Sequence, residues 1–263
     1  MSNLMKNIIE VHDLKKYYGK GKNLVKAVDG ISLTIRENEI FGFLGPNGAG
    51  KTTTIKMMAG LIKPTSGKVV IDGWDLAEHP NRVKKVVGFI PDRPFLYEKL
   101  TALEFLKFIA GLYNFSSNGV EDKIDYLFGL FGLTDWRNEL IESFSHGIKQ
   151  RLVMASAFVH QPKLIIVDEP MVGLDPKGAK LVKEVFRGFC AKGGTIFMST
   201  HTLEVAEEVC DRIAIIQEGK IIAAGNMKEL RERTGSDGKN LESVFFKLTG
   251  GEEVKKLVEA LKF

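Results

Sequence analysis

Residues 39–58 read EIFGFLGPNGAGKTTTIKMM. In this run an apolar strand leads into a glycine-rich turn, and a helix follows the turn. The turn, Gly45–Thr52, has the spacing G-x-x-x-x-G-K-[ST] of a phosphate-binding loop. Glycine is needed there because a side chain would keep successive backbone N–H groups from converging on one anion. The pattern predicts a nucleotide site, whereas the simpler alternative is a glycine turn that only caps a helix.

The loop residues have separate expected roles. The helix that begins near Lys51 directs its positive dipole end at the phosphate site. Lys51 is expected to reach the outer phosphates, and the Thr52 hydroxyl to ligate Mg²⁺. The residues expected to hold the nucleotide are Gly45, Pro46, Asn47, Gly48, Ala49, Gly50, Lys51, Thr52 and Thr53.

The composition is that of an ordinary globular protein. The chain has 263 residues, of which 44% are hydrophobic and 27% charged, a size that suits one domain or one domain with an inserted lobe. No window of 18 uninterrupted apolar residues predicts a membrane span, and the first residues lack the apolar core of a secretory signal. Cys190 and Cys210 have no metal-ligand spacing, so we expect two buried, reduced thiols.

The net charge of +4 is modest. A nucleic-acid or lipid patch is one interpretation of the N-terminal lysines, but no aromatic residues alternate with them as a stacking platform requires. We therefore expect a solvated face and no nucleic-acid partner. These lysines are Lys15, Lys16, Lys20, Lys22 and Lys26.

The order of the elements predicts an α/β fold. Alternation over residues 8–36 indicates an antiparallel β platform before the phosphate loop. Residues 93–161 carry helical stripes, which indicates an inserted helical lobe. Strands and helices alternate again from residue 163, as in a parallel sheet covered by helices. Further strands are expected at 67–73, 86–90, 163–168, 195–199, 212–217 and 220–224, and helices at 51–61, 101–113, 120–133, 147–160, 178–190, 202–210, 226–233 and from Glu252.

Two adjacent carboxylates follow the apolar strand that begins at residue 163. Open parallel sheets bind ligands at this end of their strands. Asp168 is therefore expected to lie near Mg²⁺, and Glu169 to act as the general base on the attacking water. The alternative is a pair of solvated loop acids, which the preceding Leu-Ile-Ile-Val run disfavours.

From about Ile8 to Gly250 the chain resembles the ATP-binding subunit of ABC transporters. The phosphate loop and the strand ending in Glu169 match the two nucleotide motifs of that family. The run FSHGIKQR, which begins at Phe144, resembles the family's signature segment. Gly173-Leu174-Asp175 resembles the loop after the catalytic glutamate, and Ser199-Thr200-His201 resembles the histidine switch.

The resemblance implies a P-loop NTPase (RecA-like) core that binds ATP and Mg²⁺. It makes His201 the switch beside the γ-phosphate, and Tyr18 the ring stacked on adenine. It also implies that Ser145 and Gly147 dock on the nucleotide of a second subunit. Taken alone, Ser145 is better explained as an ordinary helix cap. A lone histidine at a strand end, such as His201, is more often structural. Either Tyr17 or Tyr18 must point into the platform.

The chain departs from the family pattern at two places. His146 and Ile148 stand where glycine and glutamine are usual in the signature. Asp92 stands where the family usually has glutamine, and it still offers oxygen to Mg²⁺ or water. We expect Asp92 to matter less than Glu169.

These departures, with the segment Asn240–Gly250, resemble the branch that drives bacterial and archaeal exporters. Its membrane domain is usually a separate chain. The expected partners are thus an integral membrane subunit and a second ATPase subunit, either a second copy or a paralogue. Phe95 and Tyr97 are candidate membrane-subunit contacts, unless they pack under their own loop. The protein is expected at the cytoplasmic face of the membrane, with an ATPase domain at 1–230 and a C-terminal extension at 231–263.

Two rival functions remain. One is a soluble single-domain ABC-type ATPase that acts in assembly and drives no transport. The other is a P-loop GTPase or a small-molecule kinase, which the absence of an Asn-Lys-x-Asp motif and the presence of the signature segment disfavour. The transported substrate depends on the membrane partner, because a shared fold does not define it.

Overall fold

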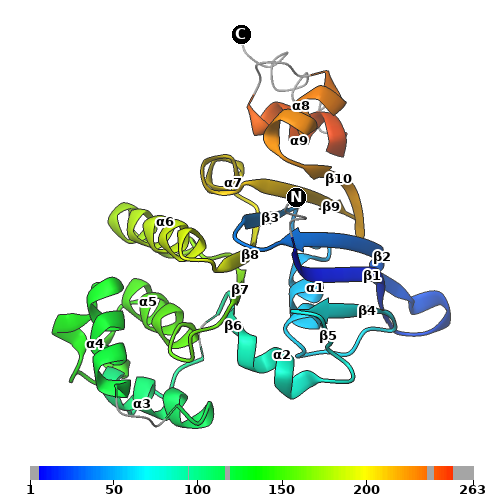
Figure 1. Ribbon diagram of the computed structural model, residues 1–263. Helices are drawn as coiled ribbons and strands as arrows, with labels where there is room; N and C mark the ends of the chain where they lie inside the picture. Colours follow the sequence, from blue (N-terminus) through cyan, green and yellow to red (C-terminus); the bar gives the residue numbers. More distant parts are fainter. Residues whose placement is uncertain (1–5, 94, 116–118, 236–239, 251–263) are drawn as a thin grey trace, which may run out of the picture.

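The computed structural model describes residues 6–93, 95–115, 119–235 and 240–250. These residues form two β-sheets, a helical lobe and helices packed on the central sheet, as Figure 1 shows. The helix expected from Glu252 lies outside the described residues. Among the helices described, none has the length and apolar character needed to cross a bilayer.

The N-terminal sheet is antiparallel. Its strands are β1 (Asn7–Tyr18), β2 (Val25–Arg36), β4 (Ser66–Ile71) and β5 (Trp74–Asp75). They lie in the order β2-β1-β4-β5. Val11 of β1 pairs with Leu33 of β2 on one side and with Val69 of β4 on the other, and all three side chains are buried. This sheet is the platform that the alternation predicts.

The central sheet carries the phosphate loop. Its strands are β3 (Ile40–Leu44), β6 (Val87–Ile90), β7 (Leu164–Asp168), β8 (Thr195–Thr200), β9 (Arg212–Gln217) and β10 (Lys220–Gly225). The order is β10-β9-β3-β8-β7-β6, with all neighbours parallel except the antiparallel pair β10 and β9. Every residue of β3, β7 and β8 is buried, as expected for strands covered on both faces.

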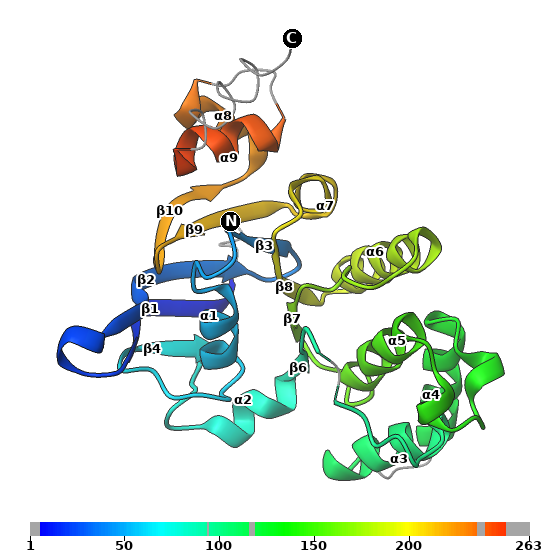
Figure 2. The same ribbon diagram turned by 180° about the vertical axis from the view of Figure 1, so that it is seen from behind.

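The helices fall into groups that can be followed in Figures 1 and 2. The α-helices are α1 (Lys51–Met58), α2 (Pro80–Val86), α3 (Ala102–Leu112), α4 (Val120–Leu130), α5 (His146–Ala157), α6 (Pro176–Ala191), α7 (Leu203–Val209), α8 (Met227–Thr234) and α9 (Leu241–Thr249). Short 3-10 turns lie at Gly21–Asn23, Thr134–Trp136 and Ile141–Ser143. Helices α3, α4 and α5 form the lobe beside the central sheet, and α8 and α9 lie beyond β10.

Three hydrophobic clusters hold these groups together. Helix α1 packs between the two sheets, where Ile55 and Met58 meet Phe41 and Phe43 of β3. The lobe and α6 share a second cluster with β7 and β8. A third cluster joins α8 and α9 to α7 and β9. The phosphate loop is thus anchored between two packed layers.

The predicted α/β architecture is confirmed, including the platform, the lobe and the parallel core. Two helices were not predicted. Helix α2 has only one buried residue, Val83, so its hydrophobic stripe is weak. Helix α9 follows the N-cap Asn240, whose side chain accepts a hydrogen bond from the backbone N–H of Ser243 at 3.2 Å. Because asparagine is a preferred N-cap residue, Asn240 could have predicted the start of this helix. The predicted cap Thr101 forms a complete capping box with Glu104.

Candidate functional site

The glycine-rich loop is held by close backbone contacts. A Cβ at Gly45 would lie 2.4 Å from the carbonyl oxygen of Ile216, and one at Gly50 2.4 Å from that of Ala27. Gly50 is also in the left-handed region, with φ +107°. Glycine is therefore required at both positions because the loop passes directly against β9 and β2. This contact fixes the turn from which α1 starts.

Lys51 is buried inside the loop. Its ammonium donates to the carbonyl oxygens of Gly45 at 2.6 Å and Pro46 at 3.2 Å, and lies 3.8 Å from Oε1 of Glu169. Burial lowers the Lys51 pKa, and the charges of Glu169 and Asp168 partly offset this effect. The loop thus holds a cation where the backbone N–H groups of the α1 N-terminus converge.

Asp168 ends β7 opposite Ser199 of β8. The two residues are register partners, and the Ser199 hydroxyl donates to Asp168 Oδ1. Asp168 is only 2% exposed. A buried carboxylate with one hydroxyl partner is well placed to accept further donors or a cation.

Glu169 takes a left-handed backbone conformation, with φ +52°. Its backbone N–H donates to the carbonyl oxygen of Ser199 at 3.3 Å and to the Ser199 hydroxyl at 3.2 Å. Its carboxylate contacts His201 twice. Oε1 lies 3.0 Å from Nδ1, and Oε2 accepts from the backbone N–H at 3.3 Å. The uncommon backbone conformation turns the carboxylate away from the strand and toward the loop.

These side chains surround one cavity of about 360 Å³. The cavity brings together the phosphate loop, Asp92, Glu169 and His201, which come from separate parts of the chain. Asp168 lies behind Glu169, within the strand end. Two lining residues, Ala27 and Val172, were not predicted. Both are small apolar residues that carry no chemical signal in the sequence.

Ser145 and Gly147 lie outside this cavity. Ser145 is the N-cap of α5, but it is exposed and its side chain makes no capping hydrogen bond. A Cβ at Gly147 would have its nearest neighbour at 3.5 Å, the carbonyl oxygen of Gly173. The ring of His146 packs on Gly173 instead, where a Cβ would lie 2.3 Å from Nδ1. Ser145 is thus exposed, and Gly147 beside it is half-buried.

Tyr17 and Tyr18 have different surroundings. The Tyr17 hydroxyl donates to Oδ1 of Asp29, which anchors that ring to the neighbouring strand. Tyr18 is 45% exposed at the end of β1, with the ammonium of Lys16 at 5.2 Å from its ring centre. Tyr18 is thus the ring with a free face.

The residues at the site fit a magnesium ion. Thr52, Asp168 and Asp92 supply hydroxyl and carboxylate oxygens, the ligands that Mg²⁺ prefers. Mg²⁺ takes one or two carboxylates and completes its shell with phosphate oxygens and water, so this donor set is sufficient for it.

Comparison with known proteins agrees with this geometry. The family described as ABC transporter matches residues 28–172. The linearmycin resistance ATP-binding protein LnrL of Bacillus subtilis is 37% identical over 230 residues, which are 88% of this chain and 73% of that protein. A solved ATP-binding subunit of an ABC transporter superposes with a TM-score of 0.86 at 34% identity, covering 92% of this chain and 99% of the other.

The dimeric bacterial ABC transporter cassette MJ0796 is also similar, with a TM-score of 0.76 at 26% identity over 83% of this chain and 98% of that one. MJ0796 is also known as a dimer in a post-hydrolysis state with ADP and Pi, and the similar protein cbiO1 of Clostridium perfringens is part of the ABC transporter complex cbiONQ. The family match covers more than half of the chain, and the phosphate loop, the acidic strand end and the histidine meet in one cavity. The chain therefore belongs to the ABC transporter family, as an ATP-binding subunit whose ATPase activity is coupled to transport.

Proposed function

We propose that two ATPase subunits close face to face around two ATP molecules. Each ATP is held by Gly45–Thr53 of one subunit and by Ser145 and Gly147 of the other. The partner is a second copy of this chain or a paralogue. The observation that carries the proposal is that Ser145 is an exposed N-cap whose hydroxyl makes no capping bond. A helix N-terminus with a free hydroxyl suits a phosphate from outside the chain.

In this arrangement Glu169 accepts the proton of the attacking water. Its carboxylate is oriented for that task by the two contacts with His201. Lys51 neutralises charge on the outer phosphates, and Tyr18 stacks on the adenine. Mg²⁺, held by Thr52 and Asp168 with Asp92 nearby, supplies further positive charge when bound.

We propose that hydrolysis powers export through a separate membrane subunit, at the cytoplasmic face of the membrane. The name of the relative LnrL, a resistance protein, supports the export direction. The contact is expected at the helical lobe and the loop 92–97. Phe95 is 82% exposed there, although its ring meets that of Tyr97 edge-on at 6.0 Å, whereas Tyr97 is 50% exposed and also packs edge-on against Phe108 of α3 at 5.3 Å. Phe95 is therefore the stronger contact residue. Residues 1–230 form the ATPase domain of this proposal, and 231–263 an extension.

Light scattering tests the face-to-face dimer. The Glu169→Gln protein with ATP and Mg²⁺ is expected to run at twice the monomer mass, because hydrolysis no longer reopens the pair. Adding Ser145→Arg places a long cation on the docking surface and is expected to restore the monomer. The matched control is Ser66→Arg, at an exposed position on the platform. A Glu169→Gln protein that stays monomeric with ATP contradicts the proposal.

Purification from membranes tests the transport role. A tagged chain, purified from the solubilised membranes of its own organism, is expected to co-purify with a polytopic membrane protein. Phe95→Ser should weaken the association, and Leu24→Ser, an exposed apolar residue on the far platform, should not. An association that is absent for the unaltered chain favours the assembly ATPase instead.

A further inference from the structure

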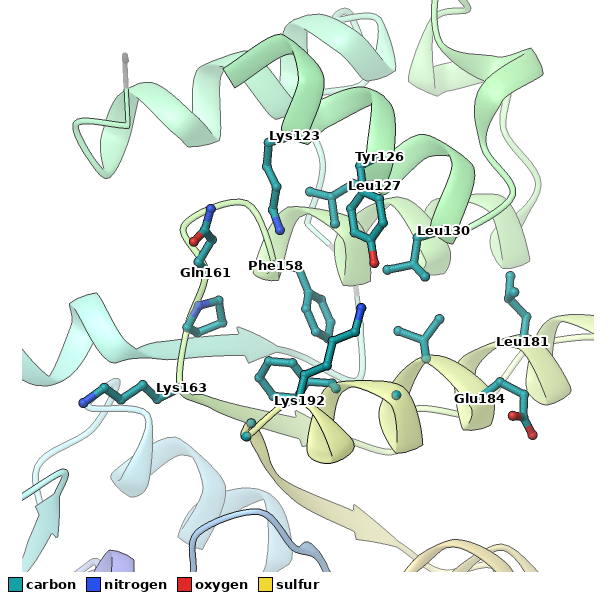
Figure 3. A pocket seen from close by; sticks show the side chains of 16 residues that line it. Lys123, Tyr126, Leu127, Leu130, Phe158, Gln161, Lys163, Leu181, Glu184 and Lys192 are labelled. Atoms are coloured by element: carbon teal, nitrogen blue, oxygen red, sulfur yellow. The ribbon is translucent and has the colours of Figure 1, made fainter. Parts of the chain in front are cut away.

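A second cavity, of about 670 Å³, lies between the helical lobe and the core. Helix α4 forms one wall, the end of α5 a second, and α6 with its following turn the third, as Figure 3 shows. It shares no lining residue with the phosphate-loop cavity. Its apolar lining includes Leu127, Leu130, Phe158, Val185 and Phe189. Its volume lies in the range typical of small-molecule sites.

Two lysines extend into this cavity from opposite walls. In Figure 3 the ammonium of Lys123 comes from α4, and that of Lys192 from the turn after α6. Neither has an ion-pair partner among the described residues. The hydroxyl of Tyr126 points into the same space, and the Tyr126 ring centre lies 5.4 Å from the ammonium of Lys123. Three donors thus surround a mainly apolar space.

The other charged residues of the lining are already neutralised. Lys163 points away from the cavity and donates to Asp72 at 2.8 Å. Glu184 also points away and accepts from Arg187 at 3.1 Å. The lining therefore has an uncompensated positive charge, contributed by Lys123 and Lys192.

Lys123 is half-buried in the lining, whereas Lys192 lies at its exposed rim. Burial lowers the Lys123 pKa, and the nearby charge of Lys192 lowers it further. Two ammonium groups that share an apolar space repel one another, and an anion placed between them relieves that repulsion. No carboxylate of the lining does this, because Glu184 is turned outward.

We propose that the cavity between α4 and α6 binds a small amphipathic carboxylate. The carboxylate lies between Lys123 and Lys192, and a hydrocarbon or aromatic body covers the apolar wall. Such a ligand contacts both the lobe and the core, so it bridges the two parts of the subunit. The site shares no lining residue with the phosphate-loop cavity, so ligand binding can be measured without nucleotide.

Calorimetric titration with decanoate tests the site. We expect one decanoate per chain. Decanol has the same hydrocarbon without the charge, and decyltrimethylammonium has the opposite charge. Both are expected to bind about tenfold more weakly or worse, because a charge-assisted hydrogen bond contributes at least that much. Equal affinity for all three compounds, or no decanoate binding at millimolar concentration, overturns the proposal.

Charge-removing variants locate the head group. Lys123→Met and Lys192→Met keep an aliphatic stem and lose the ammonium, so each is expected to weaken decanoate binding about tenfold. Lys228→Met, at an exposed position on α8, is the control and should bind as the unaltered chain does. Unchanged affinity in both cavity variants overturns the proposed head-group site.

A filling variant locates the hydrocarbon. Gly188 lines the cavity within α6, and a Cβ there meets nothing within 4 Å. Gly188→Leu therefore enters open space and favours the helix, so the fold is retained while decanoate binding is expected to be lost. Gly129→Leu is the matched control, because Gly129 also has open space and lies in α4 outside the lining. Decanoate binding that survives Gly188→Leu places the ligand elsewhere and overturns the proposal.

Discussion

Nδ1 of His201 lies 3.0 Å from Oε1 of Glu169, while the backbone N–H of His201 donates to Oε2 at 3.3 Å. The two residues follow neighbouring parallel strands, so the sheet register sets their separation. His201 therefore fixes the orientation of both carboxylate oxygens of Glu169. A base fixed in this way needs little reorganisation when it accepts a proton.

Glu169→Gln is expected to lower ATP hydrolysis at least about 100-fold, because the amide does not accept the proton of water. The affinity for ATP should be retained, since the phosphate loop is unchanged. Phosphate release and equilibrium nucleotide binding measure the two effects separately. Hydrolysis at the unaltered rate shows that another group is the base.

Asp92→Ala is expected to retain more ATPase activity than Glu169→Gln. Asp92 lines the cavity just after β6, but it is exposed, and within the described part of the chain it forms no hydrogen bond or ion pair with Glu169 or His201. The two purified variants are compared at saturating ATP and Mg²⁺. Equal inactivity of both proteins contradicts this ranking.

Lys51→Met should weaken ATP binding by about tenfold to a hundredfold, the loss of one charge-assisted hydrogen bond in a partly buried site. Lys56→Met is the control, since Lys56 is exposed on the same helix and does not line the cavity. Titration with a fluorescent ATP analogue measures both affinities. Equal losses of ATP affinity in the two variants would show that the substitutions act by disturbing helix α1, and not by removing a contact with ATP.

Tyr18→Ala should weaken ATP binding by about fivefold or more, because stacking on a base contributes about 1–3 kcal/mol. Tyr17→Ala should leave ATP affinity unchanged, since the Tyr17 ring is held on the platform by the bond from its hydroxyl to Asp29. The same titration measures both. A loss on Tyr17→Ala with none on Tyr18→Ala reverses the assignment of the stacking ring.

The two thiols are expected to resist modification at pH 8 in the folded protein. Burial raises the Cys190 pKa from 9.0 to about 12, and also raises that of Cys210, whose sulfur packs on Gly42. A disulfide reagent should detect two thiols only after unfolding in guanidinium. Rapid labelling of the folded chain contradicts this expectation.

The same pKa shift has a consequence for stability. The folded state favours the neutral thiol, so above pH 9.0 the unfolded state releases protons that the folded state retains. The contribution of Cys190 to the free energy of unfolding is therefore complete below pH 9.0 and declines up to about pH 12. Denaturant midpoints of Cys190→Ser and the unaltered chain should converge over this range.

Local sequence was sufficient for several features. The glycine spacing predicted the phosphate loop, because only glycine lets successive backbone N–H groups converge on one anion, and Gly50 has the positive φ of +107° that such a turn requires. The apolar run before Asp168 predicted a buried parallel strand. Thr101 predicted its helix start through a capping box that lies within four residues. In each case the decisive interactions are short in sequence or intrinsic to one residue type.

Other features were decided only by the tertiary structure. Tyr17 and not Tyr18 is anchored because β1 pairs with β2, which carries Asp29. Glu169 and His201 meet because β7 and β8 are neighbours. Lys123 and Lys192 share a cavity because α4 and the turn after α6 line its opposite walls, and no local pattern links them. These pairings depend on sheet register and helix packing between distant segments, which the periodicity of each segment does not specify.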